Sequence, residues 1–112
     1  MQKPNEHGVY EAEIVEELAR RERSHATVKI CQCEDALYRY ALDMAHSYGG
    51  FCSPITCYGE GYASPADAKH AAAQRLLQRF PKAWPSEPQS VHDELREMKT
   101  QIEDKLRQPT LF

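Results

Sequence analysis

The sequence has no apolar run long enough to cross a membrane, and its first residues carry no hydrophobic segment of the signal-peptide kind. These two absences predict a cytoplasmic protein. A strong excess of basic charge is also missing, since the formal net charge is −3 at pH 7. This balance argues against a strongly basic nucleic-acid-binding protein, although basic residues can gather locally. The 112 residues suffice for one small domain with a modest core and short appendages.

Motifs that carry catalysis or bind cofactors are missing as well. The histidines lie at scattered positions without metal-ligand spacing: His7, His25, His46, His70 and His92. Ser53 lies outside a nucleophile-elbow sequence, and no phosphate-binding glycine loop is present. We therefore expect a protein that is not an enzyme and holds no cofactor.

Four cysteines are present, and their spacing leaves two interpretations. A structural zinc site needs four converging donors, usually two C-x2-4-C pairs on tight turns. Cys31 and Cys33 instead form a C-x-C pair inside a predicted strand, while four residues separate Cys52 from Cys57. Without a secretory signal, disulfide bonds are not expected. Buried free thiols that pack as small apolar side chains are favoured, and bound metal is the alternative.

The beginning of the chain predicts a helix. Tyr10, Ile14 and Leu18 recur at every fourth position, which favours a helix over residues 9–23 behind a flexible arm of residues 1–8. Glutamates lie early in this segment and arginines late, as suits the helix dipole.

Three strands are predicted to follow, over residues 27–33, 37–46 and 51–58. In the second strand, one face gathers the apolar side chains of Tyr38, Tyr40, Leu42 and Met44. Pro54 cannot donate a backbone hydrogen bond, so the first half of the third strand is expected at an edge or a bulge. Four tyrosines could stack nucleic-acid bases if exposed, but their alternation favours core packing: Tyr38, Tyr40, Tyr58 and Tyr62.

A second helix is predicted to complete the domain of residues 9–80. Ser64 stands at the N-cap position and Pro65 at the first helical position. The expected buried stripe consists of Ala68, Ala71, Ala72, Leu76 and Phe80. Its alanines imply close approach to a sheet, and Pro81 is expected to end the helix.

A proline-rich linker over residues 81–89 then leads to a third predicted helix over residues 90–107, with Ser90 as its cap. One narrow apolar seam follows this helix: Val91, Leu95, Met98, Ile102 and Leu106. The seam either joins two copies in a homodimer through residues 91–106 or lies across the chain's own domain. The second arrangement is favoured.

The segment from Gly59 to Leu77 resembles the end of a double-stranded-RNA-binding domain. In that family, a glycine-rich strand end leads into Ser-Lys-Lys-x-Ala-Lys and an alanine-rich helix, and the stretch here reads SPADAKHAAAQRLL. The matching residues are Gly61, Ser64, Ala68, Lys69, Ala71, Ala72 and Leu77. The resemblance implies an α+β fold of αβββα order over residues 9–80: a three-stranded antiparallel sheet backed by two helices, to which the C-terminal helix is added.

Departures from the family pattern decide what this resemblance implies for function. Pro65 and Ala66 replace two lysines that clamp phosphates in the family, and Lys69 alone remains. In the family, the first helix contacts the minor groove, whereas the expected first helix here is acidic. Recognition of double-stranded RNA depends on phosphate and 2′-hydroxyl contacts, so we expect weak binding or none, and a scaffold used for protein contact. The alternative is a nucleic-acid-binding module that uses the remaining basic residues Lys69, Arg75, Arg79 and Lys82.

The last five residues, Gln108 to Phe112, resemble the pentapeptide by which bacterial polymerases and repair factors bind the replication sliding clamp. Gln108, Leu111 and Phe112 match its glutamine and two apolar anchors, Thr110 is close to its small polar residue, and Pro109 replaces its usual leucine. Anchors buried in a partner's pocket contribute about 1.5–3 kcal/mol each before ordering costs. Folding of this end back onto its own domain is the competing interpretation.

These observations predict a small non-catalytic adaptor of a bacterium, plasmid or phage that binds the sliding clamp through its C-terminal peptide. The domain would then contact a second protein or a nucleic acid. The alternatives are the nucleic-acid-binding module and, third, a phage-type protein inhibitor of a host system.

Overall fold

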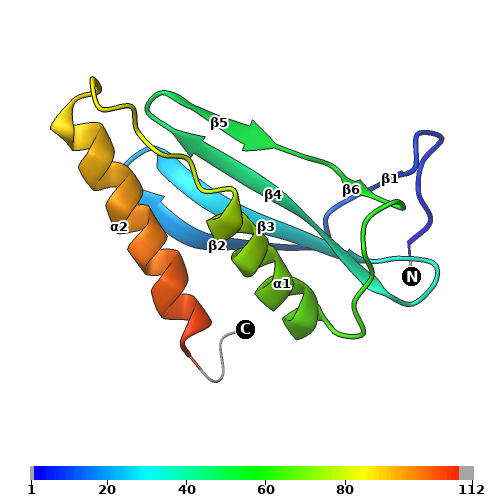
Figure 1. The fold of residues 1–112 in the computed structure, drawn as a ribbon. Coiled ribbons are helices and arrows are strands. Elements are labelled where there is room, and N and C mark those ends of the chain that lie inside the picture. The colour runs from blue at the N-terminus through cyan, green and yellow to red at the C-terminus, as the bar shows by residue number, and fades with distance from the viewer. Residues whose placement is uncertain (1, 109–112) are drawn as a thin grey trace.

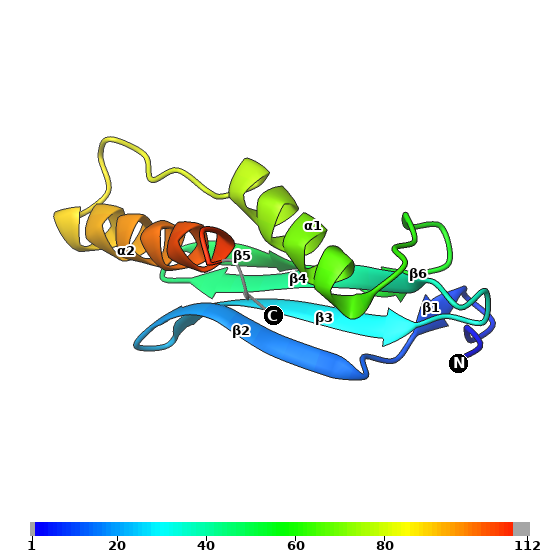
Figure 2. The ribbon, with the colours of Figure 1, turned by 90° about the horizontal axis from the view of Figure 1, so that it is seen from below.

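A four-stranded antiparallel sheet covered on one face by two helices forms the body of the protein (Figures 1 and 2). The structure, a computed structural model, describes residues 2–108. The sheet order is β2-β3-β4-β5, with β1 and β6 paired separately. The elements are β1 (Val9–Tyr10), β2 (Ile14–Arg21), β3 (Ser24–Gln32), β4 (Tyr38–His46), β5 (Gly49–Cys52), β6 (Ile55–Thr56), α1 (Pro65–Gln78) and α2 (Gln89–Leu106). The α+β class is confirmed.

The helix expected over residues 9–23 is wrong, because this segment forms β1 and β2. A spacing of four residues is also a multiple of two, so it places side chains on one face of a strand as well as of a helix. A register shift between Glu17 and Ala19 then lets the adjacent Leu18 and Ala19 both be buried. The sheet therefore gains a fourth strand, and the expected αβββα order is not found in the described residues.

A two-residue turn joins β2 to β3. Arg21 pairs with Ser24 across this turn, and Glu22 adopts a φ of 56°. Ser24, the residue directly after the helix expected over residues 9–23, is thus the first residue of a strand.

The main core lies between the sheet and the helices. From β3 it takes Ala26, Val28 and Ile30, and from β4 Leu42 and Met44. Tyr38, Tyr40 and Tyr62 pack against this core, so the expected core role is confirmed for these three. Tyr58 is 87% exposed, and the same expectation is wrong there.

Local signals placed α1 well. The Ser64 hydroxyl accepts a hydrogen bond of 3.1 Å from the Asp67 backbone N–H, and Pro65 is the first helical residue. Of the expected buried stripe, Ala68, Ala72 and Leu76 are buried, and so is Ala73, which the prediction did not include. Ala71 is only half-buried, and Phe80 is half-buried and lies beyond the end of the helix, so the prediction is wrong for these two. The helix ends at Gln78, three residues before Pro81.

The apolar seam of α2 is buried within the chain. Val91, Leu95, Met98 and Ile102 belong to the main core, which confirms the arrangement across the domain. The helix begins one residue before the predicted cap: Pro88 occupies the cap position and no side chain makes a capping hydrogen bond. A homodimer through residues 91–106 would have to use the remaining, polar surface of this helix.

A second, smaller core covers one end of the opposite face of the sheet. The short β1–β6 pair places Tyr10 and Ile55 against Cys31, Cys33 and Ala41. The segment expected as an arm is tied to the same end, since the Gln2 backbone N–H donates to the Gln32 carbonyl at 3.0 Å. Within the described residues, neither helix is long and apolar enough to cross a membrane.

Candidate binding surfaces

The basic residues expected to bind nucleic acid on α1 are largely engaged within the protein. Lys69 lies 2.9 Å from the Glu16 carboxylate, and its side chain is only 14% exposed. Arg75 donates to the Gln78 side chain at 3.2 Å, and the Arg79 guanidinium lies 4.3 Å from the centre of the Phe51 ring. The fold thus uses Lys69, the one family lysine retained, as a bridge between α1 and β2.

Lys82, the fourth of these residues, lines a groove between the end of α1, the following linker and α2. The groove has a volume of about 370 Å³. Phe80 and Leu95 contribute apolar surface, and Arg96 and Lys99 extend from α2. No carboxylate is among the described residues that line it. Arg96 and Lys99 could not be singled out from the sequence, because charged residues on the outer face of a helix are ordinary.

An exposed tryptophan directly follows this groove's lining residues in the sequence. Trp84 follows the lining residue Ala83 and is 72% exposed. Its backbone is held by two contacts with Glu87: the Glu87 N–H donates to the Trp84 carbonyl at 2.9 Å, and the Glu87 carboxylate accepts from the Trp84 N–H at 3.0 Å. Within the predicted linker, residues 84–87 therefore form a hydrogen-bonded turn, and the Trp84 residue in it is exposed to solvent.

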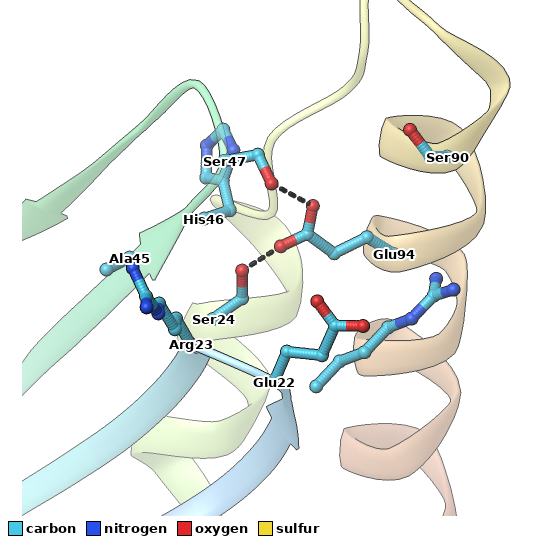
Figure 3. A pocket seen from close by; sticks show the side chains of 9 residues that line it. Glu22, Arg23, Ser24, Ala45, His46, Ser47, Ser90 and Glu94 are labelled. Carbon is cyan, nitrogen blue, oxygen red and sulfur yellow. Dashed lines mark hydrogen bonds between the residues drawn. The ribbon is translucent and has the colours of Figure 1, made fainter.

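A hollow of about 480 Å³ lies at one end of the sheet, beside the first turns of α2 (Figure 3). Its most buried ionisable side chain is that of Glu94, a residue that is 7% exposed. The carboxylate accepts hydrogen bonds from the Ser24 hydroxyl and, at 2.7 Å, from the Ser47 hydroxyl. One serine lies at the start of β3 and the other in the turn after β4, so both oxygens of this buried carboxylate are hydrogen-bonded as stability requires.

The same hollow is lined by Arg21. Its guanidinium Nε lies 3.1 Å from the Glu97 carboxylate, while its Nη1 is buried without a hydrogen-bond partner in the described structure. His46 and Ser90 also line the hollow, but no acid–base pair forms between them. We interpret the hollow as a polar junction of β2, β3, β4 and α2.

Comparison with protein-family models, curated proteins and solved structures gave no match.

The cysteines divide into two groups. Cys31 and Cys33 are buried with their sulfurs 3.8 Å apart, and burial raises the pKa of the Cys31 thiol to about 12. Both are the buried free thiols that the sequence predicted. Cys52 is exposed, so the prediction is wrong there, and Cys57 is half-buried. No cluster of three or more metal-ligating side chains occurs in the part of the chain that the structure describes.

The predicted clamp-binding peptide begins where α2 ends. Gln108 is exposed, and its backbone N–H donates to the Lys105 carbonyl at 3.2 Å. The other two predicted anchors, Leu111 and Phe112, lie outside the described residues.

Proposed function

We propose that the protein is a small non-catalytic adaptor that binds a bacterial sliding clamp through residues 108–112. The proposal is carried by the glutamine and the two apolar anchors at clamp-motif spacing. The exposure of Gln108 directly after α2 supports it, because the motif's first side chain is accessible to a partner.

The way the fold uses its polar side chains also supports an adaptor. Glu94, the most buried carboxylate, accepts from two serine hydroxyls, and Lys69 pairs with Glu16. These groups stabilise junctions between elements and are already satisfied. The proposed binding function therefore rests on exposed groups at the periphery.

Isothermal titration of the full chain with a purified bacterial sliding clamp tests this proposal. Anchors that fill pockets dominate such interfaces, so Leu111→Ala with Phe112→Ala should cost at least about 2 kcal/mol, or roughly 30-fold in affinity. Pro109→Leu should strengthen binding, because it restores the usual apolar residue.

A matched control replaces two exposed apolar residues of the folded body, Val15→Ala with Tyr58→Ala, which are 64% and 87% exposed. This variant should bind like the original chain. Absence of heat at tens of micromolar, or equal losses in both double variants, would contradict clamp docking through the peptide.

A further inference from the structure

We propose that the groove between α1, the linker and α2 binds single-stranded nucleic acid, with Lys82, Arg96 and Lys99 on its phosphates and Trp84 stacked on a base. This site is separate from the clamp-binding peptide and does not depend on it.

Charge complementarity is the first argument. Lys82 and Lys99 are exposed, and the Arg96 side chain is 70% exposed. Arg96 lies 3.4 Å from Asp93, but an ion pair this open to water is weak and leaves the guanidinium available to a phosphate. Although the whole chain carries a net charge of −3, screening limits each charge to about 8 Å at physiological salt. The local basic cluster therefore determines what approaches the groove.

The exposed indole is the second argument, and it selects the occupant. Stacking on an aromatic ring is the sequence-independent contact that single-strand-binding proteins combine with a basic groove. Trp84 directly follows the groove residue Ala83 and exposes such a ring to solvent, and two hydrogen bonds with Glu87 hold its backbone. A duplex keeps its base faces stacked inside the helix, so it would present only phosphates to this surface. An acidic peptide could form ion pairs with the lysines and the arginine, but it has no nucleic-acid base to stack on Trp84.

Fluorescence anisotropy with the full chain and a fluorescein-labelled thymidine oligonucleotide of about 12 nucleotides tests the site, starting at about 50 mM salt. Three phosphate contacts predict that the logarithm of the binding constant falls with the logarithm of salt concentration with a slope of roughly −2. Lys82→Glu with Lys99→Glu should weaken binding by at least about tenfold through the loss and reversal of two phosphate contacts.

The matched control is Lys3→Glu with Arg23→Glu, two exposed basic residues away from the groove that change the net charge equally. The affinity of this control for the oligonucleotide should stay within about twofold of the original value, because salt screens the effect of distant charges. Trp84→Ala should lower the affinity about 5- to 150-fold, which corresponds to the loss of one base stacked on an aromatic ring. Tyr58→Ala should not change the affinity. Loss of both Leu111 and Phe112 side chains should leave oligonucleotide binding intact, which separates this site from the clamp peptide.

Several results would overturn the proposal. One is no binding at low salt, and another is equal weakening by the two charge reversals. Displacement of the oligonucleotide by polyglutamate at equal charge would assign the groove to an acidic protein partner. Equal affinity for a blunt duplex would remove the role of Trp84. If the Lys82→Glu and Lys99→Glu variant fails to fold, Lys82→Gln with Lys99→Gln applies the same test.

Discussion

Glu94 shows how a single buried residue can define a junction. Its carboxylate joins the β2–β3 hairpin, through Ser24, to the turn after β4, through Ser47, and both to α2. A charged residue inside an amphipathic helix looks from the sequence like part of the solvated face. Only the packing of α2 across the sheet shows that this one faces inward.

Replacing Glu94 with Ala should destabilise the fold. The Ser24 hydroxyl is 6% exposed and would lose its acceptor, which costs about 1–3 kcal/mol for a buried hydroxyl. Glu94→Gln keeps an acceptor oxygen and should cost less. Urea unfolding followed by circular dichroism measures both. Thr100→Ala, at an exposed position of the same helix, should stay within about 0.5 kcal/mol. Unchanged stability of Glu94→Ala would mean that the network contributes nothing net.

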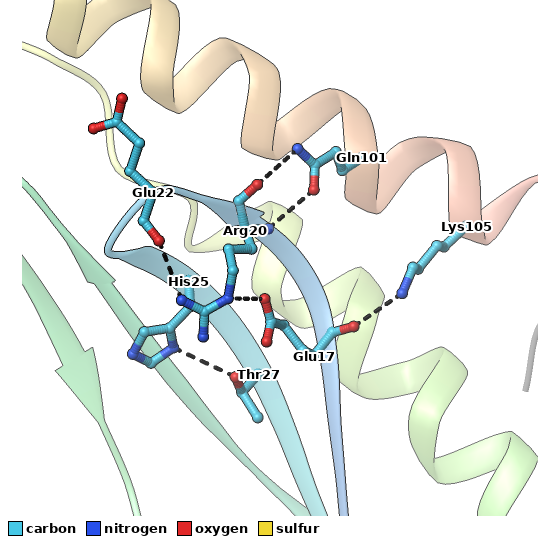
Figure 4. A network of polar contacts seen from close by, with 7 residues as sticks. All are labelled: Glu17, Arg20, Glu22, His25, Thr27, Gln101 and Lys105. Carbon is cyan, nitrogen blue, oxygen red and sulfur yellow. Dashed lines mark hydrogen bonds and ion pairs between the residues drawn. The ribbon is translucent and has the colours of Figure 1, made fainter.

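At the scale of elements, the strand β2 and the helix α2 depend on each other. Figure 4 shows the Gln101 amide bonded to the backbone of Arg20. Its Oε1 accepts from the Arg20 N–H at 2.9 Å, and its Nε2 donates to the Arg20 carbonyl at 3.1 Å. Lys105 donates to the Glu17 carbonyl at 2.9 Å. These side chains occupy backbone groups that the outer edge of a sheet otherwise offers to other chains.

Removing this cover should promote self-association. Gln101→Ala with Lys105→Ala frees the outer edge of β2, and the lost hydrogen bonds cost about 0.5–1.5 kcal/mol each. Sedimentation velocity should show larger species at concentrations where the original chain shows one. The control variant Thr100→Ala with Asp104→Ala changes two exposed positions of the same helix with the same spacing as Gln101 and Lys105. Its sedimentation distribution should match that of the original chain. The same distribution in both variants would argue against edge protection.

Sequence patterns predicted an element correctly where its signals lie within one segment. They failed where the same pattern fits both a helix and a strand. The cap, proline and alanines of α1 lie within one segment, and they placed that helix closely. The four-residue period from Tyr10 to Leu18 fits a strand as well as a helix, and the pairing of Tyr10 with Ile55 and of Ile14 with Ile30 is set by the fold. The groove also depends on tertiary packing. Lys82 could be predicted from the sequence as a binding residue, whereas Arg96 and Lys99 line the groove only because α2 packs beside the end of α1.

At the scale of the molecule, the arrangement of charge predicts poor binding of double-stranded RNA. Lys69 bridges to Glu16, and Pro65 and Ala66 offer no cations at the start of α1. Few counterions would be released on duplex binding, so affinity should be low even in low salt. Anisotropy with a generic RNA duplex near physiological salt measures this. Submicromolar binding that Lys69→Ala abolishes would refute it.

The contact between Arg20 and Gln101 also has a consequence for how the chain is made. The two residues are 81 positions apart, so β2 is synthesised long before the helix that covers its edge. Until α2 emerges, the nascent sheet carries an open strand edge and an uncovered apolar face, the features that make incomplete folds aggregate. A truncated chain that ends before α2 should therefore depend on chaperones to stay in solution, because α2 supplies both the cover of this edge and part of the main core.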